Sequence, residues 1–190
     1  MIRGGSQARN RAIVAGVLGG LVGTLAMNYA QRVWTRAVDG EVPKSAGGKH
    51  DARDWQEREE GRNANELAAQ AIAKRVVGRS LTNEELSVAA PIAHYTFGAA
   101  MGGLYGCFVR DRQNRMTSGL AFGAAVWLIA DEIAMPVFQL SAPTTERSVE
   151  KHAQSFAAHI VFGTVAELVR AKTISKVTSR RTRAEDTSGI

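Results

Sequence analysis

The chain has only one cysteine, Cys107, and lacks the short motifs that mark common catalytic sites. A single cysteine excludes an internal disulfide, so the compartment cannot be inferred from cystines. No G-x-S-x-G, H-E-x-x-H, P-loop or G-x-G-x-x-G pattern occurs in the 190 residues. The sequence therefore gives catalysis little support, and we expect no cofactor.

Four stretches are almost free of charged residues: 12–30, 86–109, 117–140 and 153–169. A helix of two dozen residues rises about 36 Å, enough to cross a hydrocarbon core of about 30 Å. The mean hydropathy of −0.14 hides this pattern because the polar residues are gathered between the apolar blocks. The sequence predicts one all-α domain, residues 1–190, with four transmembrane helices. A soluble, Ala-rich helical bundle is the alternative.

The first apolar block, residues 12–30, follows a basic arm, as the core of a secretory signal peptide also does. It is longer than a typical signal core and leads to no clear cleavage site, which favours an uncleaved span. Glycines four residues apart recur in three blocks: Gly16 and Gly20, Gly98 and Gly102, Gly119 and Gly123. This spacing lets helices approach closely inside a membrane, although glycine is also simply common in spans.

The polar segment 32–85 separates the first two blocks and has no net charge, with ten basic and ten acidic residues. A flexible stretch is expected at 42–48 and a solvated charge run at 51–62. Apolar residues from Ala64 to Gly78 recur with helical spacing, which predicts an extra amphipathic helix. This helix could lie on the bilayer surface, cap the bundle or pack on its own loop. Thr82 and Glu85 then have capping-box spacing, which predicts a helix start there.

The basic residues predict an orientation. Residues 1–11, 110–116 and 170–190 contain twelve Lys and Arg against three acidic residues, while the two other connections contain twelve of each. The excess next to the spans places both termini, with the basic tail 170–190, in the cytoplasm. It also explains the net charge of +6 without nucleic acid as a partner. The expected partners are the lipid bilayer and either a second copy of the chain or another membrane protein.

Four apolar blocks carry a polar residue at a similar depth: Thr24, His94, Glu132 and His159. Counting 1.5 Å per residue places each histidine and Glu132 roughly 10–12 Å below the outer boundary. Asp131 and Glu132 are adjacent, about 100° apart on an α-helix, so only one can point straight at the bundle axis. We expect Glu132 to face inward and Asp131 to be hydrated or bonded to an adjacent helix.

This polar centre allows three interpretations. His94, Glu132 and His159 could bind a divalent metal ion, but no single helix has metal-ligand spacing. Carboxylates and histidines could instead pass protons, as they do in pumps and transporters. The third interpretation is an ion pair that fixes helix packing. Glu167, in the last block, is expected to pair with Arg170 or Arg110.

The sequence A-D-E-I-A-M-P at 130–136, L-S-A-P at 140–143, His152, and H-I-V-F-G at 159–163 resemble the YagU-like family of bacterial inner-membrane proteins. His94 with Gly98 and Gly102 fits the same resemblance. It implies a small bacterial inner-membrane protein of unknown activity, linked to stress or acid survival in some members. We expect a structural or accessory protein that uses its outer loop for partner or lipid contact. The alternative is a proton- or ion-coupled transporter or channel.

Overall fold

The computed structural model describes residues 3–38, 64–109, 114–134, 137 and 149–188. The elements in these ranges are α1 (Arg3–Val38), α3 (Ala64–Val76), α4 (Asn83–Phe108), α5 (Arg115–Val126), the π-helix η1 (Trp127–Ala134) and α7 (Val149–Ser188). Every element is a helix, so the predicted all-α fold is confirmed. The features expected at 42–48, 51–62 and 110–113, and most of the third apolar block after Ala134, lie outside the described residues.

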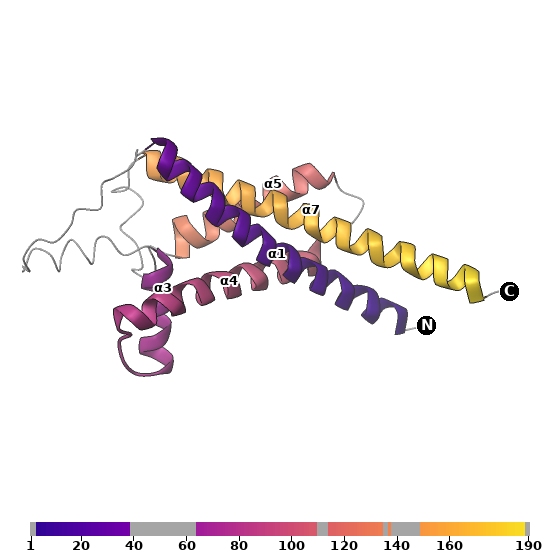
Figure 1. Ribbon diagram of the computed structural model, residues 1–190, viewed down its shortest axis with the longest axis horizontal. Helices are drawn as coiled ribbons and strands as arrows, with labels where there is room; N and C mark the ends of the chain where they lie inside the picture. The colour runs from indigo at the N-terminus through magenta and orange to yellow at the C-terminus, as the bar shows by residue number, and fades with distance from the viewer. Residues whose placement is uncertain (1–2, 39–63, 110–113, 135–136, 138–148, 189–190) are drawn as a thin grey trace, which may run out of the picture.

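Helices α1 and α7 form the centre of the molecule (Figure 1). They run antiparallel, so the start of α1 and the end of α7 lie at the same end. Helix α4 packs along α1, and α5 packs along α7. The main helix pairs are therefore α4–α1, α1–α7 and α7–α5, with α3 packed on α4.

Glycines allow the long helices to touch backbone to backbone. A Cβ added to Gly16 of α1 would lie 2.1 Å from the carbonyl oxygen of Gly102 in α4. A Cβ added to Gly123 of α5 would lie 2.3 Å from the carbonyl oxygen of His159 in α7. The other glycines named from the sequence lie in the same two contacts: Gly20, Gly98 and Gly119. Any side chain at these positions would force the helices apart, since protein interiors have little free volume.

Helix α4 begins with the predicted capping box, which is confirmed. The Glu85 backbone N–H donates to Thr82 Oγ1 at 3.2 Å, and the Thr82 N–H donates to the Glu85 carboxylate at 2.8 Å. Arg79 also donates to both carboxylate oxygens, at 2.8 and 2.5 Å. The Arg79 guanidinium and the Thr82 N–H together lower the pKa of Glu85 to about 2.

The predicted amphipathic helix is present as α3, and Gly78, with φ of 75°, follows its end. Helix α7 differs from the prediction because it continues through the basic tail to Ser188 rather than ending near residue 169. Residues 170–188 contain neither glycine nor proline, the two residues that interrupt a helix most strongly.

Two stretches are long and apolar enough to cross a membrane, judged by length and composition. They are Ser6–Ala37 in α1, with mean hydropathy 1.6, and Arg115–Ala134 across α5 and η1, with mean hydropathy 1.2. These contain the first predicted span and most of the third. The second and fourth predicted spans lie within α4 and α7, and their crossing of a membrane stays a prediction.

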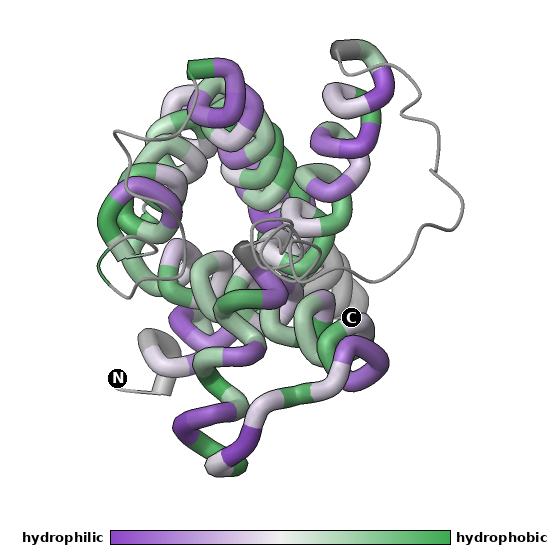
Figure 2. The backbone as a smooth tube through the Cα atoms, turned by 90° about the vertical axis from the view of Figure 1, so that its left-hand side faces the viewer, coloured by the Kyte–Doolittle hydropathy of each residue, from purple (hydrophilic) through white to green (hydrophobic). Residues whose placement is uncertain are grey.

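The large apolar side chains lie mainly on the surface. The largest buried cluster contains few of them: Met27, Phe122, Val126 and Phe162, with Ala158 and Ala166. Exposed ones occur on each long helix, for example Leu25 on α1, Ile92 and Phe108 on α4, Leu128 on η1 and Leu168 on α7. Figure 2 gives the hydropathy along these helices. Small residues therefore fill much of the helix contacts, while bulky apolar residues face outward.

Candidate functional site

The third predicted span departs from α-helical geometry where its two carboxylates lie. Helix α5 ends at Val126, and η1 continues as a π-helix that includes Asp131 and Glu132. The i→i+5 hydrogen bonds of a π-helix make a wider turn, so adjacent side chains diverge less than in an α-helix. The prediction of regular α-helix through residues 127–134 is therefore wrong. π-helical segments are rare in proteins, and those that do occur are often found at functional sites.

Both carboxylates contact α7. Glu132 Oε1 lies 2.9 Å from His152 Nδ1, and the side chains are 7% and 22% exposed, respectively. The Ser155 hydroxyl donates a hydrogen bond to Asp131. His152 and Ser155 are three residues apart, so they lie on the same face of α7. The wide turn of η1 thus lets two neighbouring carboxylates bind one helix face.

The geometry fixes the tautomer of neutral His159. Its Nδ1 lies 2.9 Å from the backbone carbonyl oxygen of Ser155, one turn earlier in α7. A carbonyl oxygen only accepts, so Nδ1 must carry the proton and donate it. In the neutral ring Nε2 is then the acceptor nitrogen. The His159 ring is buried.

His94 connects this region to the amphipathic helix. Its Nδ1 lies 3.3 Å from the Asn65 side-chain nitrogen on α3. Because an amide NH₂ donates, this contact suits a neutral His94 with a lone pair on Nδ1. His94 also lies within electrostatic range of His159 and Asp131. The charges of α4, η1 and α7 are therefore coupled at this point.

Thr24 lies in the glycine contact between α1 and α4. Its side chain is buried, and its hydroxyl donates to the Gly20 carbonyl oxygen in its own helix at 2.9 Å. A Cβ at Gly98 would collide with this hydroxyl. Thr24 thus fills the space above Gly98 and satisfies its polar group locally.

In the structure, the polar residues expected to form one centre take part in separate but neighbouring contacts. Asp131 bonds to Ser155, Glu132 pairs with His152, and His94 contacts Asn65. A direct contact of Glu132 with His94 or His159 stays a prediction. The sequence reasoning did not assign roles to His152 and Ser155. Their spacing to His159, i, i+3 and i+7, places all three on one helix face and is the signal that could have found them.

A second polar contact is buried near the other end of α7. Arg170 donates to the Glu167 carboxylate through Nε and Nη2, at 2.7 and 3.0 Å, and both side chains are 2% exposed. The predicted pairing of Glu167 with Arg170 is confirmed. The guanidinium carbon lies 5.9 Å from the ring centroid of Tyr105, which stacks on Phe122. This ion pair therefore connects α7 with α4 and α5.

The metal hypothesis receives no geometric support. Among the described residues, no three His, Cys, Asp or Glu side chains are grouped so that they could hold a metal ion.

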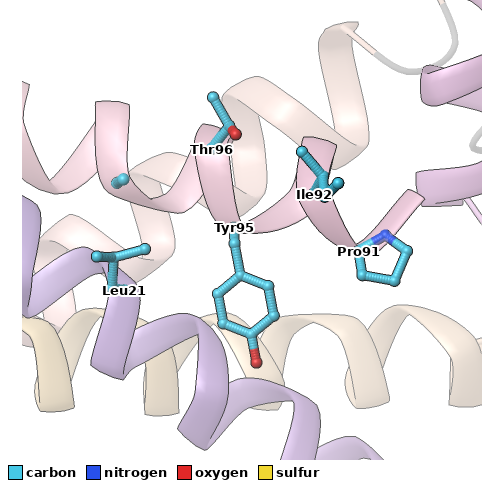
Figure 3. A pocket seen from close by; sticks show the side chains of 6 residues that line it. Leu21, Pro91, Ile92, Tyr95 and Thr96 are labelled. Atoms are coloured by element: carbon cyan, nitrogen blue, oxygen red, sulfur yellow. The ribbon is translucent and has the colours of Figure 1, made fainter. Parts of the chain in front are cut away.

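An open surface groove of about 410 Å³ lies between α1 and α4 (Figure 3). It is lined by Leu21, Pro91, Ile92, Tyr95, Thr96 and Ala99. The lining contains none of the carboxylates or histidines described above.

Long glycine-packed helices, two of them suited to crossing a membrane, define the class: an all-helical protein with candidate membrane spans. The model of the family described as "Protein of unknown function (DUF1440)" matches residues 69–168, and the chain belongs to this family. The matched region runs from α3 into α7 and includes His94, Asp131, Glu132 and His159, whereas α1 lies outside it. No curated protein and no solved structure is similar enough to match the chain.

Proposed function

We propose that this protein is a four-span helical protein of the bacterial inner membrane, with a structural or accessory role exerted through its outer side. The observation that carries the proposal is the reversed distribution of side chains. Bulky apolar residues are exposed along α1, α4, η1 and α7, while glycines lie at the helix contacts and Thr24, His159, Glu167 and Arg170 are buried. A soluble protein rarely exposes so many bulky apolar side chains along its helices, whereas lipid solvates them without cost.

The burial of the two apolar stretches supports the same placement. In α1, 39% of the most apolar window is buried within the protein, and in the α5–η1 stretch only 17%. The core helix of a soluble protein would be mostly buried, because its apolar side chains have no other shelter from water. The exposed majority of these windows suits contact with acyl chains.

The proposed orientation has both termini in the cytoplasm. The antiparallel arrangement of α1 and α7 supports it, because it brings their basic ends to one end of the molecule (Figure 1). Basic residues beside spans favour the cytoplasmic side. Helix α3 and the Asp131–Glu132 cluster would then lie toward the outer side. The resemblance to YagU-like proteins supports the inner membrane as the location.

The accessory role is favoured over transport by the surroundings of the polar cluster. A transporter needs water to reach its ionisable residues. Glu132 and Asp131 are instead engaged by side chains of α7. Helix α3, packed on α4, offers an exposed surface for contact with lipid, a second copy or another membrane protein.

Flux measurements test the role. The purified chain, reconstituted in liposomes, should conduct no more protons across a pH gradient than empty liposomes do. Glu132→Gln should behave like the wild type. Carbonate washing of membranes tests separately whether the protein spans the membrane. The native protein should stay in the membrane fraction, and its release without detergent would contradict the proposed placement.

A proton- or ion-coupled transporter is the second candidate, and η1 is the observation that favours it. The π-helix presents Asp131 and Glu132 to Ser155 and His152, and His159 lies one turn further along α7. Carboxylates and histidines in such an arrangement can pass a proton from one to the next. Proton flux above that of empty liposomes, abolished by Glu132→Gln, would establish this candidate and reject the accessory role.

A further inference from the structure

One side of α3 is fixed to the beginning of α4. Its apolar part is a small cluster of Ala69, Leu86 and Ala90. Two polar contacts flank it: Gln70 Oε1 accepts a hydrogen bond from the Leu81 N–H at 3.1 Å, and Asn65 contacts His94 at 3.3 Å. Helix α3 is therefore held at one end of the long helices rather than free in its loop.

The last turns of α3 expose apolar and basic side chains on more than one side of the helix. Ile72 and Val76 are 56% and 78% exposed, and Val77 is exposed next to them. Lys74 and Arg75 lie on the same two turns and are also exposed. Exposing branched apolar residues to water costs free energy, about 25 cal/mol per Å² of apolar surface. An occupant is therefore expected that both shelters the apolar residues and carries negative charge.

We propose that this C-terminal end of α3 binds the headgroup region of anionic phospholipids, and this rests on the four-span placement proposed above. Ile72 and Val76, with Val77 just after the helix, would enter the boundary between headgroups and acyl chains. Lys74 and Arg75 would extend their aliphatic stems along this boundary and direct their charges to lipid phosphates.

Lipid is favoured over a protein partner by charge and by continuity of the apolar surface. The exposed basic pair on α3 is complementary to anionic headgroups. Val88 and Ile92, exposed on the first turns of α4, extend apolar surface from this end along the helix that would enter the bilayer. Lipid solvating α4 would therefore reach the level at which α3 is held.

A spin label on α3 tests the proposal in the full chain. Cys107→Ser removes the native thiol, and Val76→Cys carries the label; the protein is placed in nanodiscs of phosphatidylglycerol or phosphatidylcholine. In phosphatidylglycerol the label should be accessible to oxygen and shielded from a water-soluble nickel complex. The double change Lys74→Gln with Arg75→Gln should lower the ratio of lipid-bound to free α3 by roughly thirty-fold, because each basic residue near an anionic surface contributes about 1 kcal/mol. The shift should be absent in phosphatidylcholine.

The matched control is Arg32→Gln with Arg36→Gln, which removes two exposed charges from the end of α1 and should leave the label unchanged. An equal shift in this control would overturn the proposal, because any nearby charge would then suffice. Free access of the nickel complex in phosphatidylglycerol would overturn it as well. Spin–spin broadening from a second copy would assign this end of α3 to a dimer instead. Incorporation of the chain into the discs reports separately on the proposed membrane placement.

Discussion

At the scale of single residues, ionisable side chains are used in pairs rather than alone. Glu132 pairs with His152, Glu167 with Arg170 and Glu85 with Arg79. The first two pairs are well shielded from water, so removing one partner leaves the other without compensation in a poorly solvated position. The third is exposed and is expected to contribute through its role in the helix cap.

The Glu132–His152 pair gives the first prediction. His152→Ala should destabilise the protein by about 1.5–3 kcal/mol, because it removes a hydrogen bond to a largely buried carboxylate. Glu132→Gln in the same background should recover part of this loss, since it removes the remaining charge. Thermal melts of the purified single and double variants in detergent measure the coupling. Additive effects of the two changes would mean that the residues do not interact.

At the scale of the elements, the glycine contacts and the helix cap decide how the helices are placed. Gly16 and Gly102 bring α1 and α4 into backbone contact, and Gly123 does the same for α5 and α7. The capping box determines where α4 begins. Helix η1 changes the direction of its side chains without ending the helical segment.

Gly102→Ala should destabilise the α1–α4 contact by about 1–3 kcal/mol, since its Cβ would lie 2.3 Å from the Gly16 carbonyl oxygen. Gly103→Ala is the matched control on the next residue. There the Cβ would meet Val17 Cγ2 at 3.0 Å, which is the end of a side chain and can move. Thermal unfolding of both variants in detergent should separate them clearly. Equal losses would mean that the backbone contact is unimportant.

The helix cap should depend on pH. The pKa of Glu85 is lowered from 4.5 to about 2 by Arg79 and the Thr82 N–H, so its ionised form stabilises the fold. This contribution is present above pH 4.5 and is lost as the pH falls toward 2. The stability difference between wild type and Glu85→Gln should therefore shrink over this range. Melts of both proteins between pH 7 and pH 2 measure it, and a constant difference would contradict the assignment.

At the scale of the whole molecule, exposed apolar residues distinguish a membrane protein from a soluble bundle. Leu128 is 50% exposed on η1, within the stretch suited to crossing a membrane. In a soluble protein, Leu128→Arg would change stability by about 0.5 kcal/mol or less. In a bilayer the arginine would cost about 2.5–3.5 kcal/mol or more.

We therefore expect Leu128→Arg to reduce the carbonate-resistant fraction of the protein strongly. Val149→Arg serves as the control, because Val149 is 84% exposed but lies outside the predicted spans. It should remain fully membrane-bound. Equal behaviour of the two variants would argue against the proposed placement of η1 in the bilayer.

The sequence by itself determined the helical class, the capping box and the amphipathic helix, and it narrowed the partner of Glu167 to Arg170 or Arg110. Each depends on residues close together in the chain, through periodicity, cap spacing or an i, i+3 pair. Only the tertiary structure decided that η1 is a π-helix and that Glu132 reaches His152. It also decided that α1 packs between α4 and α7. These features depend on how separate helices pack, and the close approach of their glycines selects one register among several that the sequence pattern allows.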